Sequence, residues 1–338
     1  MTQLSSPPPG EEITVTADLV EFGDGLVGLI GNMARADGRT YVIAGRYQTE
    51  GDLLRAPEEA VLAAFDDVGW ELWRTELDGG PTQVVVVNGD LWVRSHDEER
   101  NLTRIDSSDG RVLGHVTIDH MMDMVGAFES LWVHTDEAVW GEGVSEHVVR
   151  VDPDLSTTSV EIPSIPAPDG CDPCPDGPTA GSDAIWVPRG DLGVAVIDAD
   201  TNEVTVIPVE DIAHEVLKVA VDGDVAYVAS LSQVTSIVDG QVRATVSPGQ
   251  IQYLGPMDAV FGVQLPNRRF EVLRANDPMV VEHRQISTDA IASEIDGEAW
   301  VETGRNYNLR RVELLHASAG DTPESTAMTQ SDEVPRTR

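Results

Sequence analysis

A short β-prone segment centred on an aromatic residue recurs at least six times along this chain of 338 residues. The aromatic residues that mark the repeat are Trp92, Trp132, Trp186, Tyr227, Phe261 and Trp300. They are spaced 40, 54, 41, 34 and 39 residues apart. A period near 40 is typical of the sheets, or blades, of a β-propeller. The repeat therefore predicts an all-β fold in which each period forms one sheet.

Four β-prone runs separated by turn residues make up the second repeat, at 83–87, 91–93, 102–106 and 112–118. Such runs predict a four-stranded antiparallel meander. The second run reads Leu91-Trp92-Val93 and lacks the polar alternation of a half-exposed strand. Because stacked sheets bury both faces of their central strands, we expect the aromatic residues to pack between sheets rather than bind a ligand.

The third run of several repeats ends in an aspartate that is followed by turn residues. These aspartates are Asp106, Asp152, Asp198 and Asp239. An aspartate side chain can accept a hydrogen bond from the backbone two residues on and so start a hairpin turn. We therefore expect them to have a structural role.

The two ends of the repeat array predict how the ring closes. After Trp300 only one further strand is evident, at 309–315, whereas 13–20 form a spare β-run. Because an uncovered sheet edge invites pairing with other chains, we expect the N-terminal run to complete the last sheet. The prediction is a seven-bladed β-propeller of four-stranded antiparallel blades, closed by an N-terminal strand, as a single domain over 12–316. We expect 1–11 and the polar tail 317–338 to be disordered.

The composition is strongly acidic, with 59 Asp and Glu against 22 Lys and Arg, a formal net charge of −37. Such a surface repels nucleic acid and anionic lipid and favours cations or basic partners. No apolar run reaches the length of a membrane span. The first residues lack the basic and apolar regions of a signal peptide. We thus expect a cytoplasmic protein if the chain is full length, and an extracytoplasmic one if a leader has been removed.

Adaptation to salt also explains this charge, because salt screens the repulsion among carboxylates. We then expect the melting temperature to rise between about 0.1 M and about 1 M salt, as followed by circular dichroism. A melting temperature that stays flat or falls over this range would contradict salt adaptation.

Two paired motifs carry a family resemblance: Gly-Asp-Leu-Trp-Val at 89–93 and Leu-Thr-Arg-Ile-Asp-x-x-x-Gly at 102–110. They resemble the YVTN and virginiamycin B lyase-like group of bacterial β-propellers. The resemblance covers repeats two to five best. It implies a propeller and, for the lyase of the group, a metal-dependent His and Glu pair late in the chain. The late histidines here, His283 and His316, match no catalytic motif, so no catalytic residue is carried over.

The loops after the second strand of each sheet should open on one face of a propeller, the top face, together with the loops between sheets. The candidate binding residues on this face are His96, His134, His147, Arg189, Arg305 and Tyr307. Histidines beside carboxylates can bind a divalent cation or transfer protons. No triad spacing, HExxH or phosphate loop is present, so we expect most of these residues to be solvated loop positions. No cofactor is predicted, and binding of a divalent cation is kept as an alternative.

Two local motifs have competing explanations. We expect Cys171 and Cys174 to form a loop disulfide if the protein is extracytoplasmic. A metal site would need two further ligands, and a redox centre would need the pair to lie at the start of a helix. The run 120–124 reads His-Met-Met-Asp-Met. It could bind a soft metal, but we expect its methionines to fill the core.

These observations favour a monomeric, non-enzymatic module that presents a top face to a small ligand or a protein. The enzymatic alternative is a metal-assisted lyase or hydrolase acting at the central top cleft with His96, His134 or His147. A purely structural module of a surface assembly is a third possibility.

Overall fold

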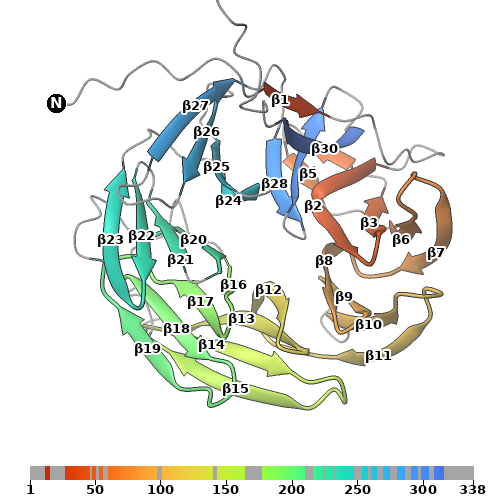
Figure 1. Ribbon diagram of the computed structural model, residues 1–338. Coiled ribbons are helices and arrows are strands. Elements are labelled where there is room, and N and C mark those ends of the chain that lie inside the picture. Colours follow the sequence, from red (N-terminus) through yellow and green to blue (C-terminus); the bar gives the residue numbers. More distant parts are fainter. Residues whose placement is uncertain are drawn as a thin grey trace, which may run out of the picture.

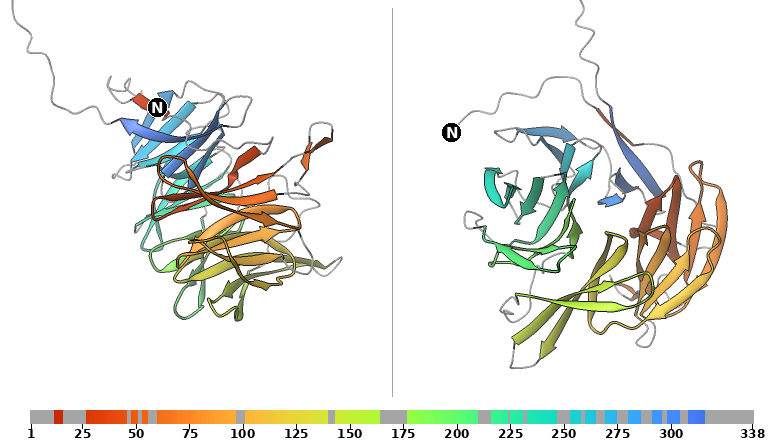
Figure 2. Two further views of the ribbon diagram at one scale, coloured as in Figure 1. Left: turned by 90° about the vertical axis from the view of Figure 1, so that its right-hand side faces the viewer. Right: turned by 60° about the horizontal axis from the view of Figure 1, so that its bottom comes forward.

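The computed structural model describes 12–15, 27–45, 48–50, 53–55, 60–96, 101–139, 143–163, 177–209, 216–223, 225–230, 233–246, 253–257, 260–264, 269–274, 280–285, 291–295, 298–303 and 308–315. Among these residues every regular element is a β-strand. Figure 1 shows the strands gathered into sheets around a common centre. Figure 2 shows the same sheets from two further directions.

Five four-stranded antiparallel sheets, named sheets one to five in chain order, follow one another between 27 and 246. Sheet one consists of β2 (Val27–Ala36), β3 (Arg39–Gly45), β6 (Ala60–Phe65) and β7 (Glu71–Leu77). Sheet two consists of β8 (Pro81–Val87), β9 (Asp90–Ser95), β10 (Leu102–Asp106) and β11 (Val112–Val116). Sheet three consists of β12 (Met121–Ala127), β13 (Ser130–Val139), β14 (Gly143–Val151) and β15 (Thr157–Ile162).

Sheet four consists of β16 (Thr179–Ala180), β17 (Ala184–Pro188), β18 (Val194–Asp198) and β19 (Val204–Ile207). Sheet five consists of β20 (Lys218–Asp222), β21 (Val225–Ala229), β22 (Val234–Val238) and β23 (Gln241–Val246). The four strands of each sheet follow the chain from the centre outwards, as the meander predicts. A two-stranded hairpin that the sequence analysis did not anticipate, β4 (Gln48–Glu50) with β5 (Leu53–Arg55), lies between β3 and β6.

The chain beyond 246 adds further antiparallel strands. One sheet consists of β24 (Tyr253–Met257), β25 (Val260–Gln264), β26 (Arg269–Arg274) and β27 (Val280–Gln285). The next has the order β1-β30-β29-β28, formed by β1 (Glu12–Val15), β30 (Asn308–Leu315), β29 (Glu298–Thr303) and β28 (Ile291–Ile295). In it, β1 and β30 pair antiparallel from Glu12↔Leu315 to Val15↔Val312. The strands nearest to the common centre of the sheets are β2, β8, β12, β16, β20, β24 and β28 (Figure 1).

The aromatic residues of the repeat occupy equivalent strands, as the period of 40 predicts. Each lies on the second strand of its sheet, on β9, β13, β17, β21, β25 or β29. Trp92, Trp132 and Tyr227 are at most 2% exposed, and Trp186 is partly buried. The prediction that they pack between sheets is confirmed for Trp92, Trp132 and Trp186, which contact apolar residues of the next sheet. The side chains of Phe261 and Trp300 lie outside the described part of the chain.

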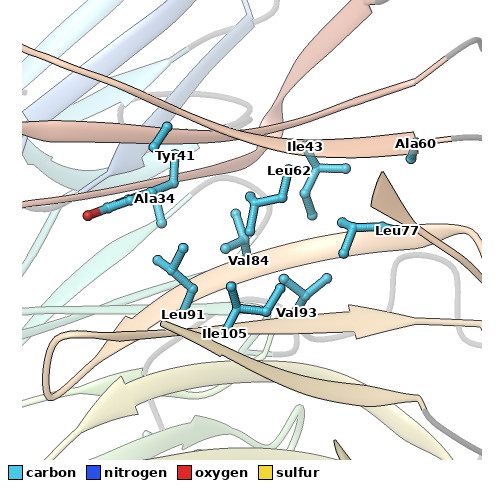
Figure 3. Close-up of a cluster of buried hydrophobic side chains, with 11 residues drawn as sticks. Ala34, Tyr41, Ile43, Ala60, Leu62, Leu77, Val84, Leu91, Val93 and Ile105 are labelled. Atoms are coloured by element: carbon cyan, nitrogen blue, oxygen red, sulfur yellow. The ribbon is translucent and has the colours of Figure 1, made fainter. Parts of the chain in front are cut away.

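An apolar core fills the space between sheets one and two (Figure 3). It contains Ala34, Tyr41, Ile43, Ala60, Leu62, Ala64, Leu77, Val84, Leu91, Val93 and Ile105. Tyr41 and Ile43 come from β3, whereas Leu91 comes from β9 of the next sheet. Burying such a side chain stabilises the fold by roughly 1.5–3 kcal/mol. This core joins two sheets that share no backbone ladder.

Arginines of the third strands reach from one sheet to the next. Arg104 lies opposite Trp92, with its guanidinium carbon 5.9 Å from the centroid of the indole ring, and donates to the carbonyl oxygen of Pro153 in sheet three. Arg150 repeats this arrangement over Trp132 at 5.6 Å and donates to the carbonyl oxygen of Ala199 in sheet four at 3.3 Å. Stacked, hydrogen-bonded arginines of this kind join neighbouring sheets through both packing and charge.

The turn aspartates divide into two groups. Asp106 Oδ1 accepts the backbone N–H of Ser108 at 2.9 Å, and Asp198 Oδ1 accepts that of Asp200 at 3.1 Å, as predicted. Asp152 differs in its partners: its carboxylate accepts hydrogen bonds from Arg150 and Ser130, and so has a structural role of another kind.

Hydrogen bonds from Thr201 lower the pKa of Asp198 below its ordinary value. The stabilisation from such a carboxylate is complete above the pKa of the unfolded chain and is lost as the pH falls through the lower folded pKa. We therefore expect Asp198→Ala to lower the free energy of unfolding at pH 7, and the difference from wild type to shrink towards about pH 2. Urea unfolding at several pH values measures this. A difference that does not change with pH would contradict the proposed linkage.

Two-residue turns join the first and second strands of several sheets. Asn88 and Gly89 adopt the left-handed region at φ 51° and 80°, the geometry that favours Asn-Gly. In sheet three the same turn is made by Phe128 and Glu129, at φ 52° and 60°. Side chains with a β-carbon are strained in this region.

We expect Glu129→Gly to raise the free energy of unfolding by about 0.5–1 kcal/mol, because it removes the β-carbon at an exposed left-handed position. Denaturant unfolding measures the change. Glu129→Ala is the control, since it keeps the β-carbon and should give no gain. An equal gain from both variants would show that loss of the carboxylate, not of backbone strain, is responsible.

Candidate functional site

A buried network of three polar side chains joins sheets three and four. His134 lies on β13, Glu146 lies on β14, and Arg189 directly follows β17. Nε2 of His134 is 3.0 Å from Oε2 of Glu146, and Nη1 of Arg189 donates to the same oxygen. Nε of Arg189 also donates to the carbonyl oxygen of Pro163, after β15, at 2.9 Å. Arg189 is fully buried, and His134 and Glu146 are 9% and 6% exposed.

The arrangement makes this network a cross-link of the fold. A buried carboxylate is costly unless a counter-ion and hydrogen bonds compensate it, and Arg189 supplies both to Glu146. The expectation of solvated loop residues is therefore wrong for His134 and Arg189. It failed for His134 because β13 runs on to Val139 and β14 begins at Gly143, so the polar residues after Trp132 continue the sheet. It failed for Arg189 because this residue, just after β17, reaches Glu146 and Pro163 of the preceding sheet.

A small polar pocket opens on the other face of sheet three. Thr135 and His147 are opposite one another in the ladder, so their side chains share a face, while His134 and Glu146 project from the opposite face. The pocket encloses about 240 Å³. Its lining residues are Ile118, Asp119, His120, Thr135, His147, Val149 and Ser159. Oγ of Ser159 lies 3.3 Å from Nδ1 of His147.

Backbone and amide contacts hold the loop between β11 and β12 that forms one wall of this pocket. Nδ2 of Asn101 donates to the carbonyl oxygen of Ile118 at 2.5 Å, and its Oδ1 accepts the N–H of Ile118 at 3.0 Å. The N–H of Asp136 donates to the carbonyl oxygen of His120 at 3.2 Å. The pocket is thus built on a fixed loop and three strands of one sheet.

A second polar cluster ties sheets two and three together near the centre. Nε2 of Gln83 on β8 donates to Oδ1 of Asp123 on β12 at 2.5 Å and to the carbonyl oxygen of Met124 at 3.1 Å. Arg94 on β9 donates to the carbonyl oxygen of Met122. Burial lowers the pKa of the Arg94 guanidinium, and the Asp123 carboxylate acts in the opposite direction. Asp123 therefore serves as a counter-charge to a partly desolvated arginine.

The remaining predicted site residues are not among the residues of these two clusters or the pocket. His96 is exposed, and its backbone N–H donates to the carbonyl oxygen of Gly79 at 2.7 Å. Arg305, Tyr307, Cys171 and Cys174 lie outside the described residues, so their roles stay predictions.

The run 120–124 contributes to both core and surface. Met121 and Met124 are buried in the core, as expected, whereas Met122 is 45% exposed because it projects from the opposite side of β12. His120, which was not among the predicted site residues, lines the pocket together with His147 of a later strand.

Two searches of the described part of the chain gave negative findings. Within it, no group of three or more His, Cys, Asp or Glu side chains is arranged to hold a metal ion. The same residues include no helix of the length and apolar character needed to cross a membrane.

Comparison with family models and with curated proteins finds no match, but solved structures resemble the fold. A catalytically inactive virginiamycin B lyase from Staphylococcus aureus with quinupristin has 12% identity and a TM-score of 0.62 over 90% of this chain and 100% of the lyase. The WD40 β-propeller domain of Doa1 has 12% identity and a TM-score of 0.55 over 90% and 98%. BBS1N in complex with ARL6DN has 12% identity and a TM-score of 0.53 over 88% and 95%.

At this level of identity the comparisons show the fold alone. Together with the four-stranded antiparallel sheets, they define the chain as a protein of the β-propeller fold.

Proposed function

We propose that this chain is a non-enzymatic binding module, a closed seven-bladed propeller whose top face receives a protein partner. Support for closure comes from two strand contacts: β28 lies beside β2, and β1 pairs with β30. A ring closed by its N-terminal strand requires both. The top face carries the loops between the second and third strands and the loops between blades.

The pocket beside His120 and His147 is the observation that supports a protein partner best. Its volume of about 240 Å³ is below the roughly 300–1,000 Å³ of pockets that enclose drug-sized ligands. It matches a single side chain better than a whole small molecule. Its imidazoles, hydroxyls and the exposed Asp119 carboxylate offer hydrogen bonds to a polar group, and the net charge of −37 favours a basic one.

The state of the buried His and Glu pair supports binding over catalysis. A general base or metal ligand must reach its substrate or ion. His134 and Glu146 are buried, and the carboxylate is already bound by Arg189. A neighbouring propeller-like fold, BBS1N, is described in complex with ARL6DN, which is consistent with a fold that serves protein recognition.

Histidine ring signals in nuclear magnetic resonance test the proposal, with a panel of capped amino acids as probes. We expect capped arginine or lysine to shift the ring signals of His120 and His147, and His147→Ala to abolish the effect. His115→Ala is the matched control, because His115 is an exposed histidine that bonds Thr103 on the neighbouring strand. If no capped amino acid shifts these signals, the pocket is not a side-chain receptor.

A calorimetric titration with Zn²⁺ tests the enzymatic alternative directly. We expect no stoichiometric binding that depends on His120 or His147. Tight one-to-one binding that is lost in His147→Ala would overturn the proposal and favour a metal-assisted lyase or hydrolase.

A further inference from the structure

Three large apolar side chains are exposed close together on sheet one. Val68 and Trp70 lie in the turn between β6 and β7, and Leu72 lies at the start of β7. They are 68%, 73% and 47% exposed. Single exposed apolar residues are common, but a contiguous group that includes a tryptophan marks an interaction site.

The turn that carries Trp70 is held rigidly by its own backbone. Oδ1 of Asp66 accepts the N–H of Val68 at 3.1 Å and that of Trp70 at 2.7 Å. The N–H of Asp66 donates to the carbonyl oxygen of Trp70 at 3.0 Å. Gly69 adopts φ 86°, which favours glycine, and its N–H donates to the carbonyl oxygen of Asp66 at 3.1 Å. A turn whose backbone is already fixed loses little conformational entropy when a partner covers it.

The two sides of β7 differ in their surroundings. The Trp73 ring lies 6.0 Å from that of Tyr41, and its Nε1 donates to the carbonyl oxygen of Ser107 in sheet two at 3.1 Å. That side of β7 is therefore occupied. Thr75 Oγ1 donates to the carbonyl oxygen of Gly110 at 2.6 Å, which brings the start of β11 alongside. Leu72 alternates with Trp73 along β7, so it projects from the other side of the strand, which is exposed.

Carboxylates surround this surface. Asp67, Glu71, Glu76 and Asp78 are exposed within the same stretch of chain. Arg74 carries the opposite charge, but Nη2 of its guanidinium is paired with Glu71 at 2.6 Å. The surface thus combines an apolar centre with an acidic rim.

We propose that this rim patch, formed by Val68, Trp70 and Leu72, docks a polypeptide segment whose apolar side chains are flanked by lysines or arginines. The apolar centre would be covered by the partner's apolar side chains, and the carboxylates would face its cations. A second copy of the chain fits less well, because it would bring another surface of net charge −37 against the acidic rim. Buried interface tryptophans often carry much of the binding energy.

The rim patch is independent of the proposed pocket. The β6–β7 turn joins the third and fourth strands of a sheet, at the end opposite to the loops of the top face. A failure of the pocket proposal leaves the rim patch intact, and the converse holds too.

A fluorescein-labelled amphipathic peptide of leucine and lysine serves as the probe, with a leucine and glutamate peptide of the same pattern as its counterpart. We expect the lysine peptide to bind and the glutamate peptide not to bind. Trp70→Ala should weaken binding about tenfold or more, and Trp70→Phe should restore part of it. Val242→Ala on β23, an exposed apolar position of similar kind, is the matched control and should leave the affinity unchanged.

Tryptophan fluorescence gives a second readout. Docking should shift the emission of wild type to shorter wavelength and protect it from acrylamide, and both effects should disappear in Trp70→Phe. An affinity for the lysine peptide that is the same in Trp70→Ala and in wild type would overturn the proposal. Sedimentation that reveals a dimer of the chain, dissociated by Trp70→Ala, would overturn it in favour of self-association.

Discussion

Arg189→Ala should lower the free energy of unfolding by about 3–5 kcal/mol, as measured by denaturant unfolding. The substitution leaves the Glu146 carboxylate buried without its counter-ion and removes the link to the carbonyl oxygen of Pro163. Losing one partner of a buried ion pair costs more than losing both, because the remaining charge is uncompensated. The double variant in which Glu146 also becomes leucine should therefore recover part of the loss.

The control for this prediction is Arg74→Ala. Arg74 forms an ion pair with Glu71 on the surface, where the two side chains are 34% and 37% exposed. Exposed pairs contribute up to about 1 kcal/mol. If Arg189→Ala costs no more than Arg74→Ala, the buried network does not cross-link sheets three and four.

Deleting residues 1–21 should lower the melting temperature by several degrees and promote aggregation. The deletion removes β1 and its four paired positions on β30. Cross-strand pairs contribute up to about 1 kcal/mol each, so the loss of four pairs amounts to up to about 4 kcal/mol. It also uncovers the edge of β30, which becomes free to pair with another chain.

Deleting residues 1–11 alone is the matched control, because it leaves β1 in place. Calorimetry should show an unchanged melting temperature for this variant, and light scattering should show no aggregates. The proposal that β1 closes the ring fails if the two deletions melt at the same temperature.

The repeat period predicted the positions of the sheets because each sheet must bury the same central strand. Leu91, Trp92 and Val93 form part of β9, and the equivalent segment around Tyr227 forms β21. Their continuous apolar character is a local signal that needs no knowledge of neighbours. The hairpin of β4 and β5 was missed because its polar residues do not repeat elsewhere in the chain.

The site was harder to predict because its contacts join distant parts of the sequence. Glu146 and Arg189 are 43 residues apart and meet only once sheets three and four stack. The residues from His134 to Glu137 are all polar, so this stretch resembled a loop although it continues the strand of Trp132. His120 was not predicted as a site residue because His147, which lines the same pocket, lies on β14, two strands further along the chain.

Arg104 and Arg150 both form contacts towards the C-terminal side of the chain. Each guanidinium stacks on a tryptophan of its own sheet and donates a hydrogen bond to a backbone carbonyl in a turn of the sheet that follows. A duplicated repeat would thus carry both the donating side chain and the backbone carbonyl that receives the previous one. Because each repeat contacts the next in the same way, a repeat can be added or lost in evolution without losing the hydrogen bond between neighbouring sheets.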